Sequence, residues 1–251
     1  MAEPLLAVRG LRKRFGGLVA TDGVDVDVGE GETLAIIGPN GAGKTTLIGQ
    51  LAGDVRPDAG TIRFAGADVT ALSAAARSHR GLARSFQITS IFREFSALDN
   101  VALAVQAHAG HSFRFWQAAR AEASLREPAR AILVRVGLGG RADVVAGTLA
   151  HGEQRQLEIA MALATRPRLL LLDEPVAGMG LDESQRMVEL LRALRGHHTI
   201  VLVEHDMDVV FALADRISVL VYGRVLATGA PDAIRLDAEV RRAYLGEGQP
   251  A

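Results

Sequence analysis

The chain has 251 residues, which is enough for one domain with a sizeable hydrophobic core. Its formal net charge is −1, which excludes the strongly basic surface typical of proteins that coat nucleic acid. It contains no cysteine, so a disulfide framework and a cysteine-ligated metal site are both impossible. No stretch reaches the roughly eighteen consecutive apolar residues that span a bilayer, so a membrane role would depend on a partner protein.

The first part of the chain combines predicted strands with turns and one glycine-rich loop. A short apolar run stops at that loop, and from Thr46 the apolar spacing predicts a helix. The expected strands in this part cover residues 5–9, 24–28, 33–37 and 60–66.

The rest of the chain divides into a helical stretch and a second set of strands. Helical patterns dominate from about residue 70 to 166, and strands then alternate with helices. Such alternation predicts a mainly parallel sheet, here with a helical lobe inserted between its first and later strands. The later strands are expected at 169–173, 199–204 and 217–222, and the helices between them at 182–195 and 206–214.

Residues 38–45 read Gly-Pro-Asn-Gly-Ala-Gly-Lys-Thr and match the phosphate-binding pattern GxxxxGK[ST] between a strand and a helix. Glycines let the backbone wrap closely, with its N–H groups directed at phosphate oxygens. Lys44 is expected to reach the β- and γ-phosphates, and the Thr45 hydroxyl to bind Mg²⁺. The alternative, a glycine-rich turn that happens to contain lysine, is disfavoured by the flanking strand and helix. The predicted nucleotide contacts are Gly38, Pro39, Asn40, Gly41, Ala42, Gly43, Lys44, Thr45 and Thr46.

A second motif consists of four leucines at 169–172 followed by Asp173 and Glu174. An apolar run of this kind predicts a strand buried on both faces, whose carboxyl end delivers the acids to a ligand crevice. Asp173 is the expected Mg²⁺ ligand, and Glu174 can polarise the attacking water as a general base. Taken alone, two acids after a strand are more often a solvated strand end. Together with the phosphate loop, the catalytic interpretation is favoured.

Between these motifs, residues 148–154 read Thr-Leu-Ala-His-Gly-Glu-Gln and precede a helical run. This segment resembles the signature motif of ATP-binding cassette (ABC) proteins. Phe15 resembles the family's adenine-stacking aromatic residue, Gln87 its glutamine that touches Mg²⁺ and senses a membrane partner, and His205 its γ-phosphate switch histidine. The resemblance follows the family order over essentially the whole chain.

The resemblance implies a P-loop NTPase (RecA-like) fold with a mainly parallel core, an N-terminal antiparallel β subdomain and an inserted helical subdomain. The implied single cassette covers 1–251, with 1–85 and 167–251 forming the β subdomain and core and 86–166 the helical subdomain. It also implies that Glu174, His205 and Gln87 act in hydrolysis. Leu149, Ala150, His151, Gly152 and Glu153 would contact the ATP of an opposite subunit.

Three segments narrow the resemblance to the ATPases of branched-chain amino acid importers: 91–95, 149–155 and the ending Arg-Arg-Ala-Tyr-Leu-Gly-Glu. This subgroup implies a second ABC ATPase, identical or different, two integral membrane permeases and, indirectly, an extracytoplasmic solute-binding protein. The implied location is the cytoplasmic face of the bacterial inner membrane, as a peripheral subunit. The alternative is a cassette ATPase acting on nucleic acid or ribosomes, which usually carries a coiled coil or a tandem cassette.

Three positions depart from the family pattern. Ala150 replaces the usual signature serine and His151 the first signature glycine, so a hydroxyl contact to the γ-phosphate is unavailable. Gly152 and the following helix N-terminus can still supply backbone donors. Gly180 stands where an Asp or Asn is usual. This departure affects the expected communication between the two cassettes of a dimer, and it does not affect the expected nucleotide binding.

Overall fold

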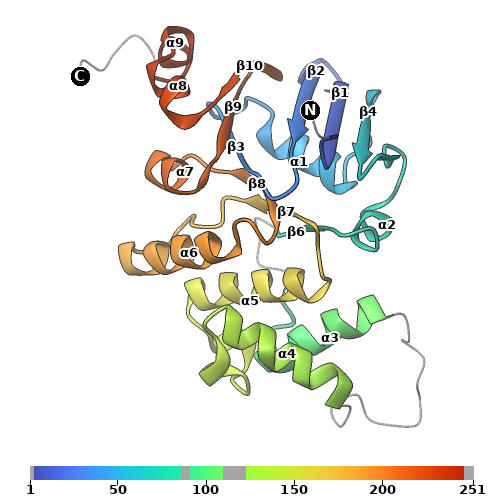
Figure 1. Cartoon of the computed structure of the whole chain (residues 1–251), viewed down its shortest axis with the longest axis vertical. Helices are drawn as coiled ribbons and strands as arrows, with labels where there is room; N and C mark the ends of the chain where they lie inside the picture. The colour runs from blue at the N-terminus through green and yellow to red at the C-terminus, as the bar shows by residue number, and fades with distance from the viewer. Residues whose placement is uncertain (1–2, 86–90, 110–122, 246–251) are drawn as a thin grey trace.

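The computed structural model describes residues 3–85, 91–109 and 123–245, and its strands form two sheets (Figure 1). The smaller sheet is antiparallel and has the order β2 (Leu18–Val28), β1 (Leu6–Phe15), β4 (Ala59–Phe64), β5 (Ala67–Asp68). The larger sheet has the order β10 (Arg224–Gly229), β9 (Arg216–Val221), β3 (Thr33–Ile37), β8 (Thr199–Val203), β7 (Leu169–Asp173), β6 (Leu82–Arg84). All its pairings are parallel except that of β10 with β9. The predicted α/β fold, with its separate antiparallel sheet, is confirmed.

Strand β7 is buried on both faces. Its side chains point alternately to the two faces of the larger sheet, and an apolar cluster covers each face. Leu169 and Leu171 pack into the apolar cluster that includes the smaller sheet and helix α1 (Lys44–Ala52). Leu170 and Leu172 pack into the cluster on the helical side. The continuous apolar run therefore holds Asp173 at a fixed point between two cores.

The helical layer consists of α3 (Ala97–Ala109), α4 (Ala123–Arg135) and α5 (His151–Ala164), with α5 nearest the sheet (Figure 1). An ion pair of 2.8 Å between Arg126 and Asp99 joins α4 to α3. Among the described residues, no helix is long and apolar enough to cross a membrane. Within the described ranges, the other helices are α2 (Ala74–Ser78), α6 (Leu181–Leu194), α7 (Met207–Leu213), α8 (Pro231–Leu236) and α9 (Ala238–Leu245), and the 3₁₀ turns are η2 (Gly139–Arg141) and η3 (Ala146–Thr148).

The two edge strands of the larger sheet were not predicted. β6 has three residues, too few to show an alternating pattern, and it falls where helix was expected. β10 alternates exposed and half-buried residues at the edge of the sheet beside β9, so no apolar run marks it. Helix α1 also begins at Lys44 rather than Thr46, directly after the left-handed Gly43.

Arg77 in α2 is the largest of the fully buried side chains in the described structure. Its guanidinium donates to the carbonyls of Gln50 and Leu51, both at 2.6 Å, and thereby caps the carboxyl end of α1. It also donates to the carbonyls of Thr70 at 3.0 Å and Leu72 at 3.2 Å. Burial lowers the pKa of Arg77, although Asp54 and Asp68 act in the opposite direction. One buried cation therefore holds the helix that follows the phosphate loop.

We expect Arg77→Met to lower the free energy of unfolding by about 3 kcal/mol, because it leaves buried carbonyls of α1 without a donor. Chemical denaturation followed by circular dichroism would measure the loss. Arg80→Met is the matched control: Arg80 is exposed, so its replacement should cost less than about 0.5 kcal/mol. Equal stability of the two variants would contradict the capping role.

Candidate functional site

The phosphate loop joins β3 to α1, and two of its glycines are required by close backbone approach. Gly43 has φ 102°, and a Cβ there would lie 2.0 Å from the carbonyl oxygen of Ala20. A Cβ at Gly38, with φ 155°, would lie 2.0 Å from the carbonyl oxygen of Leu220. Any other residue would push the loop away from the strands that support it. The loop is therefore pressed against the rest of the fold while Asn40 and Gly41 face outward.

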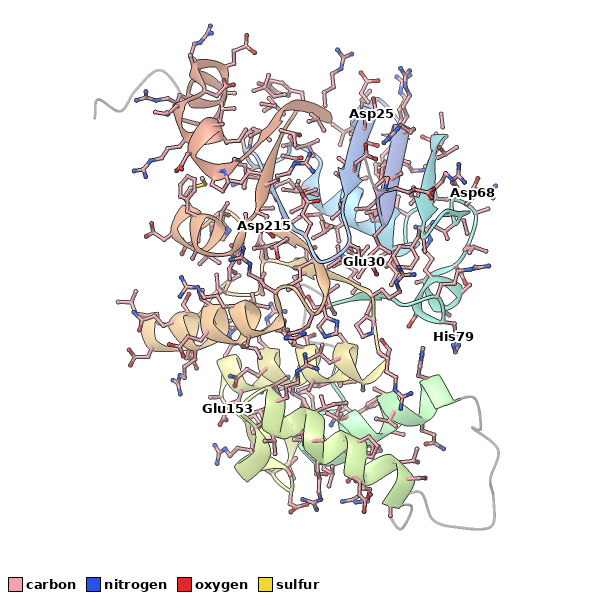
Figure 2. The ribbon with its side chains drawn as sticks, viewed as in Figure 1. Asp25, Glu30, Asp68, His79, Glu153 and Asp215 are labelled. Carbon is pink, nitrogen blue, oxygen red and sulfur yellow. The ribbon has the colours of Figure 1, made fainter. Side chains whose placement is uncertain are left out.

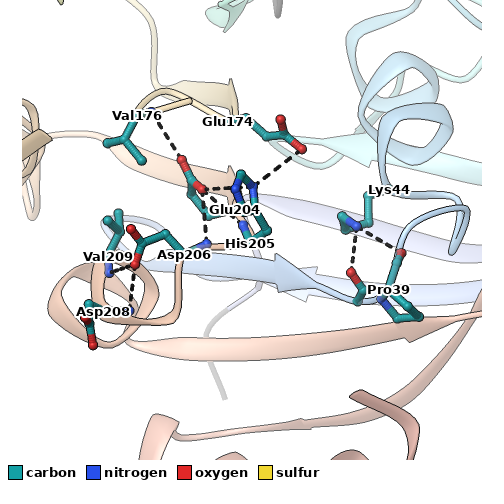
Figure 3. Close-up of polar contacts among 10 residues, drawn as sticks. Pro39, Lys44, Glu174, Val176, Glu204, His205, Asp206, Asp208 and Val209 are labelled. Carbon is teal, nitrogen blue, oxygen red and sulfur yellow. Dashed lines mark hydrogen bonds and ion pairs between the residues drawn. The ribbon is translucent and has the colours of Figure 1, made fainter. Parts of the chain in front are cut away.

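Lys44 is buried at the start of α1, and its ammonium group points into the loop (Figure 3). Nζ donates to the carbonyls of Gly38 at 2.7 Å and Pro39 at 3.1 Å. Burial lowers the pKa of Lys44, while the charges of Glu174 and Asp173 act to raise it. A lysine and a helix N-terminus thus converge where glycine-rich backbone is exposed, as an anion site requires.

Asp173, at the carboxyl end of β7, is 1% exposed. Burial raises the pKa of its carboxyl, and the guanidinium of Arg84, 3.2 Å away, acts in the opposite direction. Arg84 also bonds to Asp54 at 2.6 Å. The sequence interpretation missed Arg84 because no motif marks it.

The donor set fits Mg²⁺. A carboxylate at Asp173 and a hydroxyl at Thr45 are the hard oxygen ligands that this ion takes. Asp173 acts electrostatically on Lys44, the neighbour of Thr45, and Thr45 is exposed at the start of α1. Gln87, the third predicted ligand, lies outside the described residues.

Glu174 and His205 follow the neighbouring strands β7 and β8 and face each other (Figure 3). Glu174 has φ 50°, a left-handed conformation that costs about 1 to 3 kcal/mol in a residue with a side chain. Its N–H donates to the carbonyl of Val203 at 2.9 Å, which holds this conformation. Glu174 Oε1 lies 3.9 Å from Nδ1 of His205, whose side chain is 60% exposed. The strained turn after β7 thus presents a carboxylate beside the imidazole that follows β8.

Glu204, directly before His205, is a second residue that the sequence interpretation missed. It has no exposed surface and accepts backbone N–H groups from Val176, His205 and Asp206. Burial raises the pKa of Glu204, and these N–H groups act in the opposite direction. Asp206 in turn caps α7 by accepting from the N–H groups of Asp208 and Val209 (Figure 3).

Phe15 and the signature segment lie on other elements, β1 and α5. Phe15 ends β1 about half exposed, with Lys13 Nζ 5.4 Å from its ring centroid. The signature starts α5 in the helical layer, where Glu153 is seen in Figure 2. There the N–H of Gly152 lies 3.4 Å from a carboxylate oxygen of Glu183 in α6.

The start of α5 is only half capped. The carboxylate of Glu153 accepts from the N–H of Ala150 at 3.0 Å and binds Arg141 at 2.9 and 3.2 Å. The hydrogen bond from Arg141 lowers the pKa of Glu153. Ala150, at the N-cap, has no side-chain oxygen to accept a helix N–H in return.

We expect Ala150→Ser to raise the free energy of unfolding by about 1 kcal/mol, because the hydroxyl completes the cap. Thermal unfolding would show it as a higher midpoint. Ala193→Ser, exposed inside α6, is the control and should lower stability by about 0.5 kcal/mol. A destabilised Ala150→Ser protein would refute the half-capped helix start.

Comparisons with known proteins identify the family of the chain. Residues 21–177 match the ABC transporter family. The chain therefore belongs to the ABC transporter family, and it is an ABC ATPase. More narrowly, residues 224–249 match the family described as branched-chain amino acid ATP-binding cassette transporter.

Individual relatives match over nearly the whole chain. The high-affinity branched-chain amino acid transport ATP-binding protein BraF of Pseudomonas aeruginosa is 42% identical, covering 98% of this chain and 100% of its own. The corresponding protein LivG of Escherichia coli is 41% identical with the same coverage. The crystal structure of the ADP conformation of an ATP-binding cassette of an ABC transporter superposes with a TM-score of 0.86 at 29% identity, covering 98% of this chain and 100% of that one.

Proposed function

We propose that the chain binds MgATP and hydrolyses it to drive a membrane importer of branched-chain amino acids or a related small solute. The observation that carries the ATPase part is that Glu174, after β7, faces His205, after the adjacent strand β8. The charges of Asp173 and Glu174 also act on the buried Lys44 at the start of α1. The solute and the direction of transport rest on likeness to BraF and LivG and on the match at 224–249.

Each residue of the site has a role in this proposal. Lys44 and the loop N–H groups hold the β- and γ-phosphates. Thr45, Asp173 and Gln87 would hold Mg²⁺, which neutralises phosphate charge when bound. Phe15 stacks on adenine. Its half-exposed ring at the end of β1 supports that assignment.

Hydrolysis itself requires a base and a group that orients the water. Glu174 accepts a proton from water as the water oxygen bonds to the γ-phosphorus, and the bond from that phosphorus to the bridging oxygen breaks, which releases ADP and phosphate. His205, which faces Glu174, contacts the γ-phosphate. Two cassettes, identical or different, would enclose each ATP between the phosphate loop of one and residues 149–153 of the other. ATP then stabilises the closed pair because it contacts both halves.

The remaining partners are two integral membrane permeases and, through them, an extracytoplasmic solute-binding protein. The segment after Gln87 would contact a permease, which places the chain at the cytoplasmic face of the membrane. The named relatives are transport proteins, which disfavours the alternative of a cassette acting on nucleic acid or ribosomes.

Reconstitution with integral membrane permeases that co-purify with this chain tests the proposal. Solute-binding proteins loaded with branched-chain amino acids should stimulate ATP hydrolysis in proteoliposomes, and unloaded ones should not. Stimulation by other solutes only would refute the branched-chain assignment. Recovery of the purified chain with nucleic acid and without permeases would refute the importer.

A further inference from the structure

Two chain segments that follow adjacent strands meet on one buried carboxylate. The segment from Glu174 to Gly180 follows β7, and the segment with His205 and Asp206 follows β8. Glu204 lies between them with no exposed surface. Its contacts with both segments are drawn in Figure 3.

The two carboxylate oxygens serve different segments. Oε1 accepts from the N–H of Val176 at 3.2 Å. Oε2 accepts from the N–H of His205 at 3.0 Å and of Asp206 at 3.5 Å, and lies 3.7 Å from Nδ1 of His205. A carboxylate is the side chain that can do this, since both its oxygens are acceptors. A glutamine of the same shape would offer one acceptor and turn its NH₂ donors toward the N–H groups of the other segment.

We propose that Glu204 is a positioning residue that fixes His205 relative to the turn carrying Glu174. Glu174 lies two residues before Val176, so the carboxylate bridge adds to the pairing of β7 with β8 a second link between the base and the imidazole that faces it. The inference rests on the proposed function, because it concerns the alignment of the groups that hydrolyse ATP. A misplacement of about 1 Å in such a pair can cost about 100-fold in rate.

The test compares Glu204→Gln with Glu32→Gln, measured as assembled transporter. Glu32 also uses both oxygens, for the N–H of Gly29 and for Arg216, and neither of these partners belongs to the proposed nucleotide site. We expect Glu204→Gln to lower kcat by about 10- to 100-fold while the Kd for ATP stays within about 2-fold. Glu32→Gln should leave both unchanged. An unchanged kcat in Glu204→Gln, or an equal loss in both variants, would overturn the proposal.

Two further measurements separate positioning from general destabilisation. Adding Glu204→Gln to His205→Ala should cost less than about 2-fold more, because Glu204 acts through His205. Amide exchange at Val176 or at His205 should be at least about 10-fold faster in Glu204→Gln than in Glu32→Gln. If Glu204→Gln does not fold, Glu204→Asp replaces it, since the shorter side chain cannot reach both segments. If the wild type does not hydrolyse ATP, the proposed function fails, while the exchange rates still decide on Glu204.

Discussion

Glu174→Gln is expected to bind ATP with nearly wild-type affinity and to lose steady-state hydrolysis. Glutamine has the shape of glutamate, so the left-handed turn and its hydrogen bond to Val203 remain. It cannot accept a proton, however, so water is no longer activated beside His205. Removal of a general base lowers rates by about 100- to 10,000-fold, and kcat should fall within this range. ATP should then hold the two cassettes together, because the closed pair is no longer released by hydrolysis.

Phosphate release and size-exclusion chromatography with ATP would measure both effects. Glu189→Gln, on the exposed face of α6, makes the same chemical change outside the site and should behave as wild type. Normal steady-state phosphate release from Glu174→Gln would contradict the assignment of Glu174 as the general base. A loss of ATP binding would show instead that Glu174 maintains the conformation of the phosphate loop.

Lys44→Ala is expected to weaken the binding of ATP rather than to slow the hydrolysis step. The lysine is the buried cation of the loop, and burial already lowers its pKa, so its charge is poorly solvated and available to an anion. Removing it takes away the charge that we propose faces the β- and γ-phosphates. We expect the Kd for ATP to rise about 100-fold, which corresponds to about 2.7 kcal/mol.

Calorimetric titration with ATP would give the Kd, and thermal unfolding without nucleotide would test the fold. Arg192→Ala removes an exposed cation from the last turn of α6 and should leave the Kd unchanged. An unchanged Kd in Lys44→Ala would contradict the phosphate-loop assignment. Together, Lys44 and Glu174 should separate binding from turnover in this ATPase.

The sequence by itself determined the parts of this protein that depend on neighbours along the chain. The phosphate loop could be predicted because its glycines, Lys44 and Thr45 are consecutive and lie between an apolar strand and a helix. The four leucines before Asp173 predicted a strand buried on both faces, and each face indeed has its own core. Alternating strands and helices predicted the mainly parallel sheet for the same reason, since periodicity is a local property.

The tertiary structure decided which distant residues meet. Arg84 contacts Asp173 across 89 positions, and Glu204 contacts Val176 across 28, so no spacing along the chain marks either pair. Nothing in the sequence distinguishes Arg77 from a surface arginine. Its burial results from the packing of α2 against the end of α1. Parallel pairing of β7 and β8 places Glu174 beside His205, and their relation depends on that register. These contacts follow from the packing of whole elements. The sequence of a strand or helix determines which of its side chains share a face, but it does not determine which other element packs against that face.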